Sequence, residues 1–303
     1  MHCDVFIVGA GPAGLTAAMY GARAGFSVIV ADPGLPGGQT TMTHQIDNYP
    51  GFPDGIDGFT LGDLFSAQAK KWGAEIVTEN VVSVVSPHGP WQIKTDKNEY
   101  TAKALIIASG TQPKHIGFPG EEEFVGRGVS YCGTCDGPLY RGKTVAVLGG
   151  GNTALQEASF LSRFVEKIYL IHRRDTYRAQ QVLVDDINGN PKITPVLNAS
   201  VKEIYGGDLV RGIRVLREGK EEDIAVDGVF IFLGHTPNTL FCEGLPAVDD
   251  NGRLITNEDL ECSSPGLFAI GDVRSKKVYQ VATAVGDGAA VIHSVQEYLK
   301  TVK

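Results

Sequence analysis

Short apolar runs alternate with glycine-rich turns and helical patterns along the first part of the chain. Residues 5–8 and 28–30 are continuous apolar runs, which are typical of strands buried in a parallel sheet. Between them, residues 9–14 read Gly-Ala-Gly-Pro-Ala-Gly, and residues 15–24 have the pattern of a helix. Residues 4–31 are therefore predicted to form one βαβ unit.

This first unit has the features of a dinucleotide-binding turn. Gly9 permits a tight turn, Gly11 lets the backbone approach a pyrophosphate, and Gly14 allows the helix to pack closely on the strand. Asp32 stands at the end of the second strand, where a carboxylate can hold the hydroxyls of an adenosine ribose. A glycine motif by itself is weak evidence, but strand, helix and acid together predict dinucleotide binding.

The residues that follow show less regular patterns. Residues 33–53 are rich in Gly, Pro, Thr and Asn and are expected to form a functional loop. Residues 58–73 have the period of an amphipathic helix, and residues 75–85 and 91–95 are expected to be antiparallel strands. Residues 104–108 are a continuous apolar run, which predicts a buried parallel strand that returns to the first sheet. Polar, glycine-rich residues then place a domain boundary near residue 113.

A second βαβ pattern begins at Thr144. Residues 145–148 and 168–171 are its apolar strands, residues 149–154 read Gly-Gly-Gly-Asn-Thr-Ala, and a helix is expected to run through Phe164. Ala154 stands where the first unit has its third glycine. Basic residues follow the second strand: His172, Arg173, Arg174 and Arg178. Guanidinium groups there favour a 2′-phosphate, so the two units are expected to bind different dinucleotides.

The last part of the chain adds further strands and a helix. Residues 213–216 and 228–233 are apolar strand patterns, and residues 267–270 form another that ends in Gly271-Asp272. The Asp272 carboxylate would then reach a sheet edge where a ribityl hydroxyl can bind. Residues 280–299 have the pattern of a helix with small residues near its start.

The segment Cys132-Gly133-Thr134-Cys135-Asp136-Gly137 carries the most specific chemistry. Two thiols two residues apart, beside a carboxylate, can make, break and protonate one small disulfide. A zinc site would need further paired ligands, but the other cysteines, Cys3, Cys242 and Cys262, are single and scattered. A purely structural disulfide would close too short a loop to stabilise the fold strongly. A redox-active pair is favoured, with no metal.

Composition narrows the class of protein. A chain of 303 residues has room for two ordinary domains, and the net charge of −8 argues against binding to nucleic acid or to anionic membranes. No apolar run approaches the roughly 20 residues of a membrane span. The first residues, Met1-His2-Cys3-Asp4, lack the features of a signal peptide. The cytoplasm is therefore the expected compartment.

Seven motifs in register resemble those of the low-molecular-weight thioredoxin reductases. They are Gly-Ala-Gly-Pro-Ala-Gly (9–14), Gly-Gly-Gln (37–39), Asn-Tyr-Pro-Gly-Phe (48–52), Cys-x-x-Cys-Asp-Gly (132–137), Gly-Gly-Gly-Asn-Thr-Ala (149–154), His-Arg-Arg-Asp (172–175) and Gly-Asp-Val (271–273). The resemblance covers nearly the whole chain.

The resemblance implies an α/β fold of two Rossmann-like, three-layer dinucleotide-binding domains, in a homodimer. An FAD domain, residues 1–113 and 242–303, would be split by an inserted NADPH domain, residues 114–241, that carries the dithiol. NADPH would reduce the flavin, and the flavin would reduce the disulfide. The dithiol would then reduce thioredoxin after the two domains rotate.

The resemblance also implies a set of site residues. Cys132 would be the thiol that exchanges with thioredoxin, Cys135 the thiol that faces the flavin, and Asp136 the proton donor. The residues expected to bind FAD are Gly9, Gly11, Pro12, Ala13, Gly14, Asp32, Gly37, Gly38, Gln39, Asn48, Val81, Gly110, Gly271, Asp272, Gln280 and Val281. Those expected to bind NADPH are Gly149, Gly151, Asn152, Thr153, Ala154, His172, Arg173, Arg174 and Arg178.

The chain departs from the family pattern at two positions. The family commonly has Glu where this chain has Asp32, whose side chain is one methylene shorter. It commonly has Arg before Gln near the last helix, where this chain has Tyr279 before Gln280.

Three other functions compete with this one. A related flavoprotein that feeds a peroxiredoxin shares the pattern of residues 132–139, but it carries an additional amino-terminal disulfide domain and typically lacks the paired arginines. A ferredoxin-NADP reductase of similar fold lacks the dithiol. A non-catalytic flavin-binding scaffold would have no need for both thiols, Asp136 and two glycine turns.

Overall fold

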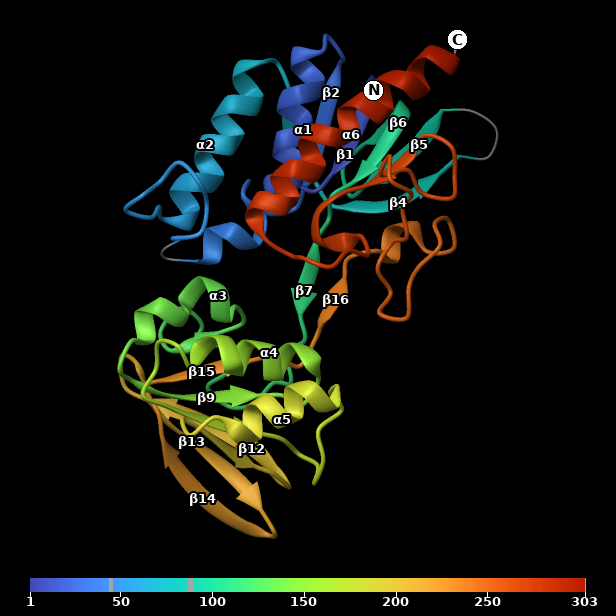
Figure 1. Cartoon of the computed structure of the whole chain (residues 1–303). Coiled ribbons are helices and arrows are strands. Elements are labelled where there is room, and N and C mark those ends of the chain that lie inside the picture. Colours follow the sequence, from blue (N-terminus) through green and yellow to red (C-terminus); the bar gives the residue numbers. More distant parts are fainter. Residues whose placement is uncertain (44–45, 87–89, 303) are drawn as a thin grey trace. The chain divides into compact units, whose positions relative to one another are not determined.

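The computed structural model describes residues 1–43, 46–86 and 90–302, and its backbone divides into two units (Figure 1). Unit 1 combines Met1–Gln112 with Thr236–Lys303, and unit 2 is the intervening segment Pro113–His235. The sequence placed its boundaries after residues 113 and 241. Both units contain parallel sheets flanked by helices, which confirms the predicted α/β class.

A seven-stranded mixed sheet forms the centre of unit 1. Its order is β3-β2-β1-β6-β5-β4, and β17 also pairs with β6. The pairs β1–β2, β1–β6, β2–β3 and β6–β17 are parallel, whereas β4–β5 and β5–β6 are antiparallel. The strands are β1 (His2–Val8), β2 (Val28–Asp32), β3 (Glu75–Thr78), β4 (Val81–Val85), β5 (Trp91–Thr95), β6 (Glu99–Ile107) and β17 (Leu267–Ala269).

Alternation along β1 explains how this sheet is covered on both faces. Val5 and Ile7 pack into one apolar cluster with residues of the helices, and Phe6 and Val8 pack into a second cluster on the opposite face. The face that carries Val5 and Ile7 is covered by α1 and α6, which lie side by side in Figure 1. The helices of unit 1 are α1 (Pro12–Arg23), α2 (Gly58–Lys71), α6 (Val281–Thr301) and the short 3₁₀ helices η1 (Gly38–Met42), η3 (Leu240–Cys242) and η4 (Gly271–Val273).

The expectation of one antiparallel strand over residues 75–85 is wrong. The segment divides into β3, which is parallel to β2, and β4, which is antiparallel to β5. The reason is the buried carboxylate of Glu79, which accepts hydrogen bonds from the Thr95 hydroxyl at 2.6 Å and the Tyr100 hydroxyl at 3.0 Å. A buried charge held by these donors fixes the turn between the two strands.

Unit 2 is built on a five-stranded parallel sheet in the order β11-β10-β9-β15-β8. A separate antiparallel sheet, β12-β13-β14, packs beside it, and the sequence indicated only part of its middle strand. The strands are β8 (Val129–Ser130), β9 (Thr144–Leu148), β10 (Lys167–Ile171), β11 (Ile193–Val196), β12 (Ala199–Gly206), β13 (Val210–Arg217), β14 (Lys220–Ala225) and β15 (Gly228–Ile231). The helices are α3 (Gly133–Asp136), η2 (Gly137–Tyr140), α4 (Asn152–Leu161) and α5 (Gln181–Gly189).

The two chain crossings between the units pair with each other. Strand β7 (Thr111–Pro113) leaves unit 1, strand β16 (His235–Pro237) returns to it, and the two form a small sheet. On the unit 1 side, the Asn238 amide donates to the Ser109 carbonyl at 2.9 Å, and the Ser109 hydroxyl donates to the Asn238 carbonyl at 2.6 Å. The ends of unit 2 are thus held beside each other.

Candidate functional site

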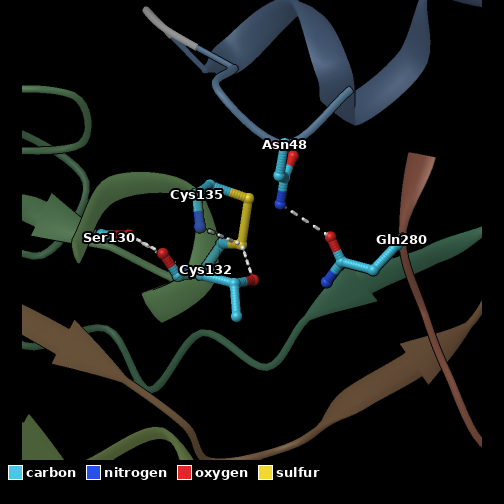
Figure 2. The surroundings of a disulfide bond; sticks show 6 residues. Asn48, Ser130, Cys132, Cys135 and Gln280 are labelled. Atoms are coloured by element: carbon cyan, nitrogen blue, oxygen red, sulfur yellow. Dashed lines mark hydrogen bonds between the residues drawn. A yellow bond between two sulfur atoms is a disulfide. The ribbon is translucent and has the colours of Figure 1, made fainter. Parts of the chain in front are cut away.

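The two cysteines of the Cys-Gly-Thr-Cys segment lie at helix α3 of unit 2. Their sulfur atoms form a disulfide, and their Cα atoms are 5.3 Å apart. Cys132 is the N-cap residue of α3, and its Sγ accepts a hydrogen bond from the backbone N–H of Cys135 at 3.2 Å (Figure 2). The first turn of α3 therefore brings the two sulfurs into bonding reach, as a redox-active pair requires.

Hydrogen bonds hold Cys132 in place ahead of this turn. The Ser130 hydroxyl accepts from the backbone N–H of Cys132 at 3.1 Å and lies 3.2 Å from the Cys132 carbonyl, to which it can donate. The Thr134 hydroxyl is 3.4 Å from the Cys132 sulfur. These short-range contacts fix the position of one sulfur without using any charged side chain.

Asp136 is the last residue of α3, directly after the second cysteine. Burial raises the pKa of the Tyr140 phenol to about 12, and the nearby charge of Asp136 adds to this effect. Tyr140 therefore stays protonated near neutral pH, and Asp136 is the acid that the sequence places beside the disulfide.

The glycine turn of unit 1 joins β1 to α1 and leaves open space at the helix start. A Cβ atom at Gly9, whose φ is +107°, would lie 2.4 Å from the Ala108 carbonyl oxygen, and one at Gly14 would lie 1.9 Å from the Gly9 carbonyl oxygen. At Gly11 a Cβ would meet nothing within 4 Å. Gly9 and Gly14 are thus required by packing, whereas Gly11 borders space that a pyrophosphate can occupy.

Asp32 holds this turn through its own carboxylate. Oδ2 accepts from the backbone N–H of Ala10 at 2.7 Å, and Oδ1 accepts from the N–H of Gly34 at 2.8 Å. Both oxygens retain lone pairs, so the carboxylate can also accept from ribose hydroxyls.

The end of β17 brings a second carboxylate to unit 1. Asp272 lies in η4, where Gly271 adopts φ +74° and a Cβ there would be 3.0 Å from the Ala13 side chain. The Oδ1 atom of Asp272 is buried without a hydrogen-bond partner, although Lys276 Nζ lies 3.8 Å away. Burial raises the pKa of Asp272 above its ordinary value, and the charges of Lys276 and Arg253 partly oppose this.

A buried oxygen without a hydrogen-bond donor destabilises the fold unless a ligand supplies that donor. Asp272 Oδ1 therefore fits the role of accepting a hydrogen bond from a ribityl hydroxyl. The loop around it is fixed by Asp287 of α6, which accepts from Gly271 N–H at 3.0 Å, Arg274 Nε at 3.0 Å and Lys276 Nζ at 3.1 Å. Burial alone would raise the pKa of Asp287, but these donors hold it below its ordinary value.

The other expected flavin-binding residues are spread over unit 1, and Gly37 and Gly38 lie beside the glycine turn between β1 and α1. Gly37 donates its N–H to the Ala10 carbonyl at 2.7 Å, and a Cβ at Gly38 would be 3.1 Å from Gly11 Cα. The Gln39 amide donates to the Thr111 carbonyl. Pro12 and Ala13 open α1, Gly110 has φ +64°, and Val81 is a buried core residue.

Asn48 and Gln280 are paired across unit 1. The Asn48 amide donates to the Gln280 side-chain carbonyl at 3.1 Å (Figure 2). Gln280 is also the N-cap residue of α6 in a capping box with Thr283, and Val281 is the first residue of that helix. This pair fixes the loop that contains Asn48 to the start of α6.

The glycine turn of unit 2 joins β9 to α4 and repeats the first arrangement. A Cβ at Gly149 would be 2.6 Å from the Phe232 carbonyl oxygen, and one at Gly150 would be 2.3 Å from the His172 ring. At Gly151 a Cβ would meet nothing within 4 Å, so this position also borders open space. Asn152 and Thr153 begin α4, and Ala154 is fully buried, as close helix packing requires.

The basic segment after β10 lies at this turn. The Arg178 backbone N–H donates to the Gly150 carbonyl at 2.7 Å, and the pair Gly151–Arg178 forms a β-bridge. Arg173, Arg174 and Arg178 are exposed, and across residues 1–43, 46–86 and 90–302 none of their guanidinium groups forms an ion pair. Three uncommitted cations beside a glycine turn suit a phosphate group.

The His172 ring lies against the same turn. Burial lowers the pKa of this imidazole, and the charges of the neighbouring arginines lower it further. Its Nε2 atom is buried and has no hydrogen-bond partner. The ring occupies the space that a side chain at position 150 would need, which explains the glycine there.

Sequence reasoning missed Arg253 and Lys276. The Arg253 guanidinium lies 4.2 Å from the centre of the Tyr279 ring, and its Nε donates to the Asp272 carbonyl at 3.3 Å. The Tyr279 hydroxyl accepts from the Lys276 N–H at 3.2 Å. Lys276 follows Asp272 by four residues, a spacing that could have revealed it. Arg253 is remote in sequence and gave no signal.

Within the described part of the chain, no helix is long and apolar enough to cross a membrane. The same residues contain no group of three or more His, Cys, Asp or Glu side chains that could hold a metal ion.

Comparisons with known proteins match the chain along nearly its whole length. The family model described as pyridine nucleotide-disulphide oxidoreductase matches residues 3–288. Proteins named thioredoxin reductase from Listeria monocytogenes and Bacillus subtilis are each 41% identical over 303 residues, covering 99% of this chain and 95% and 96% of the relatives. The solved structure of thioredoxin reductase from Streptococcus pyogenes matches with a TM-score of 0.93 at 40% identity, covering 99% of both chains.

Proposed function

Because the chain belongs to the pyridine nucleotide-disulphide oxidoreductase family, and within it to the thioredoxin reductases, we propose that it uses NADPH to reduce the disulfide of thioredoxin. The observation that carries the proposal is the Cys132–Cys135 disulfide on α3. It lies in a chain that also has two glycine turns with open space at Gly11 and Gly151. The family uses FAD and NADPH as its cofactors.

We assign FAD to unit 1. Gly11 would let the pyrophosphate approach the start of α1, Asp32 would hold the adenosine ribose, and Asp272 would accept from the ribityl chain. The orphaned Asp272 Oδ1 supports this assignment. When bound, FAD supplies two-electron chemistry between the nicotinamide and the disulfide.

We assign NADPH to unit 2, which is then an NADPH domain inserted into the FAD domain. Gly151 would face the pyrophosphate, and Arg173, Arg174 and Arg178 would pair with the 2′-phosphate. The absence of competing ion pairs for these arginines, among the residues that the structure describes, supports this assignment.

The two sulfurs of the dithiol are expected to have different roles in the reaction. One thiol must be accessible to the disulfide of the partner protein, and the other must receive electrons from the flavin. We assign the first role to Cys132 and the second to Cys135. Asp136 would move the proton that accompanies each cycle.

We further propose that the enzyme is a homodimer of the cytoplasm. The family resemblance supports the dimer. Cys3, Cys242 and Cys262 are buried and form no disulfide, and so small a use of disulfides fits a reducing compartment. Light scattering of the purified protein would test the dimer, and fractionation of cells that contain a tagged copy would test the compartment.

One experiment tests the function directly. Purified protein loaded with FAD is mixed with NADPH and with each member of a thioredoxin panel or with a peroxiredoxin, and oxidation of NADPH is followed. We expect turnover with at least one thioredoxin. Turnover with the peroxiredoxin only would favour the peroxiredoxin-linked alternative. Bleaching of the flavin without turnover of any disulfide would contradict both.

A further inference from the structure

Glu157 is an acidic residue that the proposed function does not use. It lies on α4 and is half-buried, and its Oε2 atom is buried without a hydrogen-bond partner. In the described residues no cationic side chain forms an ion pair with it. Such a group is costly to keep, so its position calls for an explanation.

The carboxylate lies against the turn that joins the two cysteines. A Cβ atom at Gly133 would be 2.2 Å from Glu157 Oε2 and 3.4 Å from the ring of Phe232. Gly133 separates Cys132 from Thr134 at the start of α3, so Glu157 occupies the space that a side chain there would fill. The absence of a side chain at position 133 lets the carboxylate approach the dithiol.

Backbone N–H groups, and no cationic side chain of the packed segment, offset the charge of this carboxylate. Burial raises the pKa of Glu157, and the backbone N–H groups of Gly133 and Thr134 oppose that shift. The titratable side chains of the packed segment are Cys132, Cys135 and Asp136, and none of them is a cation. Phe232, whose ring would lie 3.4 Å from a Cβ at Gly133, is apolar and 7% exposed. Apart from the two backbone N–H groups, nothing in this segment offsets a negative charge on Glu157.

We propose that Glu157 is a positioning residue of the redox pair, whose buried carboxylate suppresses ionisation of the Cys132 and Cys135 thiols once the disulfide is reduced. Two electrons reduce the disulfide, and the two sulfurs then bind up to two protons. A carboxylate beside them disfavours a thiolate, because two negative charges would share one poorly solvated site. By the same coupling, formation of a thiolate favours uptake of a proton by Glu157.

This inference deepens the proposed function and rests on it. Thiols that keep their protons are less exposed to unwanted oxidation, because the thiolate is the reactive form. When one thiol ionises, Glu157 would take up a proton and hold it close to the two sulfurs.

The test measures the thiol pKa in the reduced flavoenzyme from the pH dependence of iodoacetamide alkylation. Single-thiol backgrounds, Cys135→Ser and Cys132→Ser, isolate each sulfur. The remaining cysteines add little signal, because burial raises the pKa of Cys3 to about 12, of Cys242 to about 11 and of Cys262 to about 12. In each background Glu157→Gln removes the charge and keeps the shape.

We expect Glu157→Gln to lower the pKa of at least one thiol by about one unit, the scale expected for a close charge at intermediate dielectric. Alkylation at neutral pH should then be about tenfold faster. The matched control is Glu166→Gln, which removes an exposed carboxylate of the same unit and should leave the thiol pKa unchanged.

A second variant tests the geometry. In Gly133→Ala the new Cβ meets the end of the flexible Glu157 side chain rather than backbone, so the carboxylate should move away. This variant should lower the thiol pKa in the same direction as Glu157→Gln. Because both changes act on one interaction, the double variant should show less than the sum of the two shifts.

An unchanged thiol pKa in folded Glu157→Gln would overturn the proposal, and so would a loss of thermal stability without any pKa shift. Additive shifts in the double variant would overturn the contact that we infer. These readouts need no thioredoxin. A failure of the proposed function would instead appear as absent turnover while the thiol pKa values still shift.

Discussion

At the scale of single residues, Asp272 and Asp136 are both expected to be site residues, but their surroundings differ. Asp272 has a buried oxygen without a hydrogen-bond partner, and burial raises its pKa. Asp136 closes the helical turn that carries the cysteines. We interpret the first as a ligand of the cofactor and the second as a proton donor.

Asp272→Ala should therefore lose FAD more readily than Asp136→Ala. Loss of one hydrogen bond to a buried acceptor corresponds to roughly 1 to 3 kcal/mol, which is a weakening of FAD binding by about fivefold to 150-fold. Flavin content after purification and titration of the apoprotein with FAD measure the effect. If Asp136→Ala lost the flavin and Asp272→Ala kept it, the two roles would be exchanged.

The two sulfurs can be distinguished by trapping. Cys135→Ser should form a stable mixed disulfide through Cys132 with a thioredoxin that lacks its resolving cysteine. Cys132→Ser should instead leave Cys135 able to perturb the flavin spectrum as a thiolate. Non-reducing gels and absorbance spectra measure the two outcomes. Full thioredoxin turnover by either single variant would contradict the dithiol mechanism, and a reversed trapping pattern would contradict only the roles.

Arg173, Arg174 and Arg178 should set the preference for NADPH over NADH. Charge-assisted hydrogen bonds contribute roughly 1.5 to 3 kcal/mol each, less where solvent screens them, as it does at these exposed side chains. Changing all three to Ala should lower kcat/KM for NADPH at least about tenfold and leave kcat/KM for NADH nearly unchanged. The exposed Arg211→Ala is the control. Equal kcat/KM for both nucleotides in the unaltered enzyme would rule out this assignment.

Sequence was most informative for residues whose chemistry depends on local spacing. The pairing of Cys132 with Cys135 follows from one helical turn, and the glycine turns follow from their neighbours in the chain. Arg253 and Glu157 acquire their positions only through packing between distant segments. No pattern along the chain marks them, because an isolated Arg or Glu is usually a solvated surface residue.

At the scale of elements, each βαβ unit combines glycines that serve packing with one that borders open space. Gly14 brings α1 onto β1, and Gly288 brings α6 onto α1, where a Cβ would lie 2.4 Å from the Ala13 carbonyl oxygen. These close approaches place the start of α1 beside Asp272. A Cβ at Gly11 would have no such neighbour, and we therefore assign this glycine to ligand binding rather than to packing.

Gly11→Ala and Gly14→Ala should therefore fail in different ways. Gly11 has φ −75°, which Ala adopts easily, so its variant should fold with an unchanged melting temperature of the apoprotein and bind FAD more weakly. Gly14→Ala forces a Cβ against the Gly9 backbone and should destabilise the fold by roughly 2 to 4 kcal/mol. Calorimetry of the apoproteins and FAD titration separate the two. Equal losses of stability would contradict the division between packing and ligand space.

The elements that sequence misjudged depend on long-range pairing. The apolar pattern of residues 75–85 fits a strand, but whether one strand or two form is decided by Glu79 and its hydroxyl partners on β5 and β6. The sequence did not predict the sheet β12-β13-β14, because β14 (Lys220–Ala225) is mostly exposed and lacks an apolar face. Continuous buried strands such as β1 and β9 were identified because burial on both faces leaves a strong apolar run.

At the scale of the whole molecule, each unit has an apolar core of its own. Two apolar clusters contain only residues of unit 1, and two others contain only residues of unit 2. The crossings β7 and β16 pair with each other, so the ends of unit 2 lie together. An insertion with adjacent ends and a closed core is the arrangement expected of a domain that can fold by itself.

The segment Pro113–His235, produced alone, should therefore fold cooperatively and bind NADPH but not FAD. Its cores include Val145, Val147 and Leu155 on one side and Val129, Ile213 and Val229 on the other, all of them buried within the unit. The open space at Gly151 and the arginines after β10 remain in the fragment, so binding of the 2′-phosphate is retained. Circular dichroism during thermal unfolding tests the fold, and calorimetric titration with NADPH, NADH and FAD tests ligand binding.

The control is a fragment in which Arg173, Arg174 and Arg178 are changed to Ala. In the same titration this variant should bind NADPH and NADH with equal affinity. A folded fragment that bound FAD, or one indifferent to the 2′-phosphate, would show that the cofactors are assigned to the wrong units.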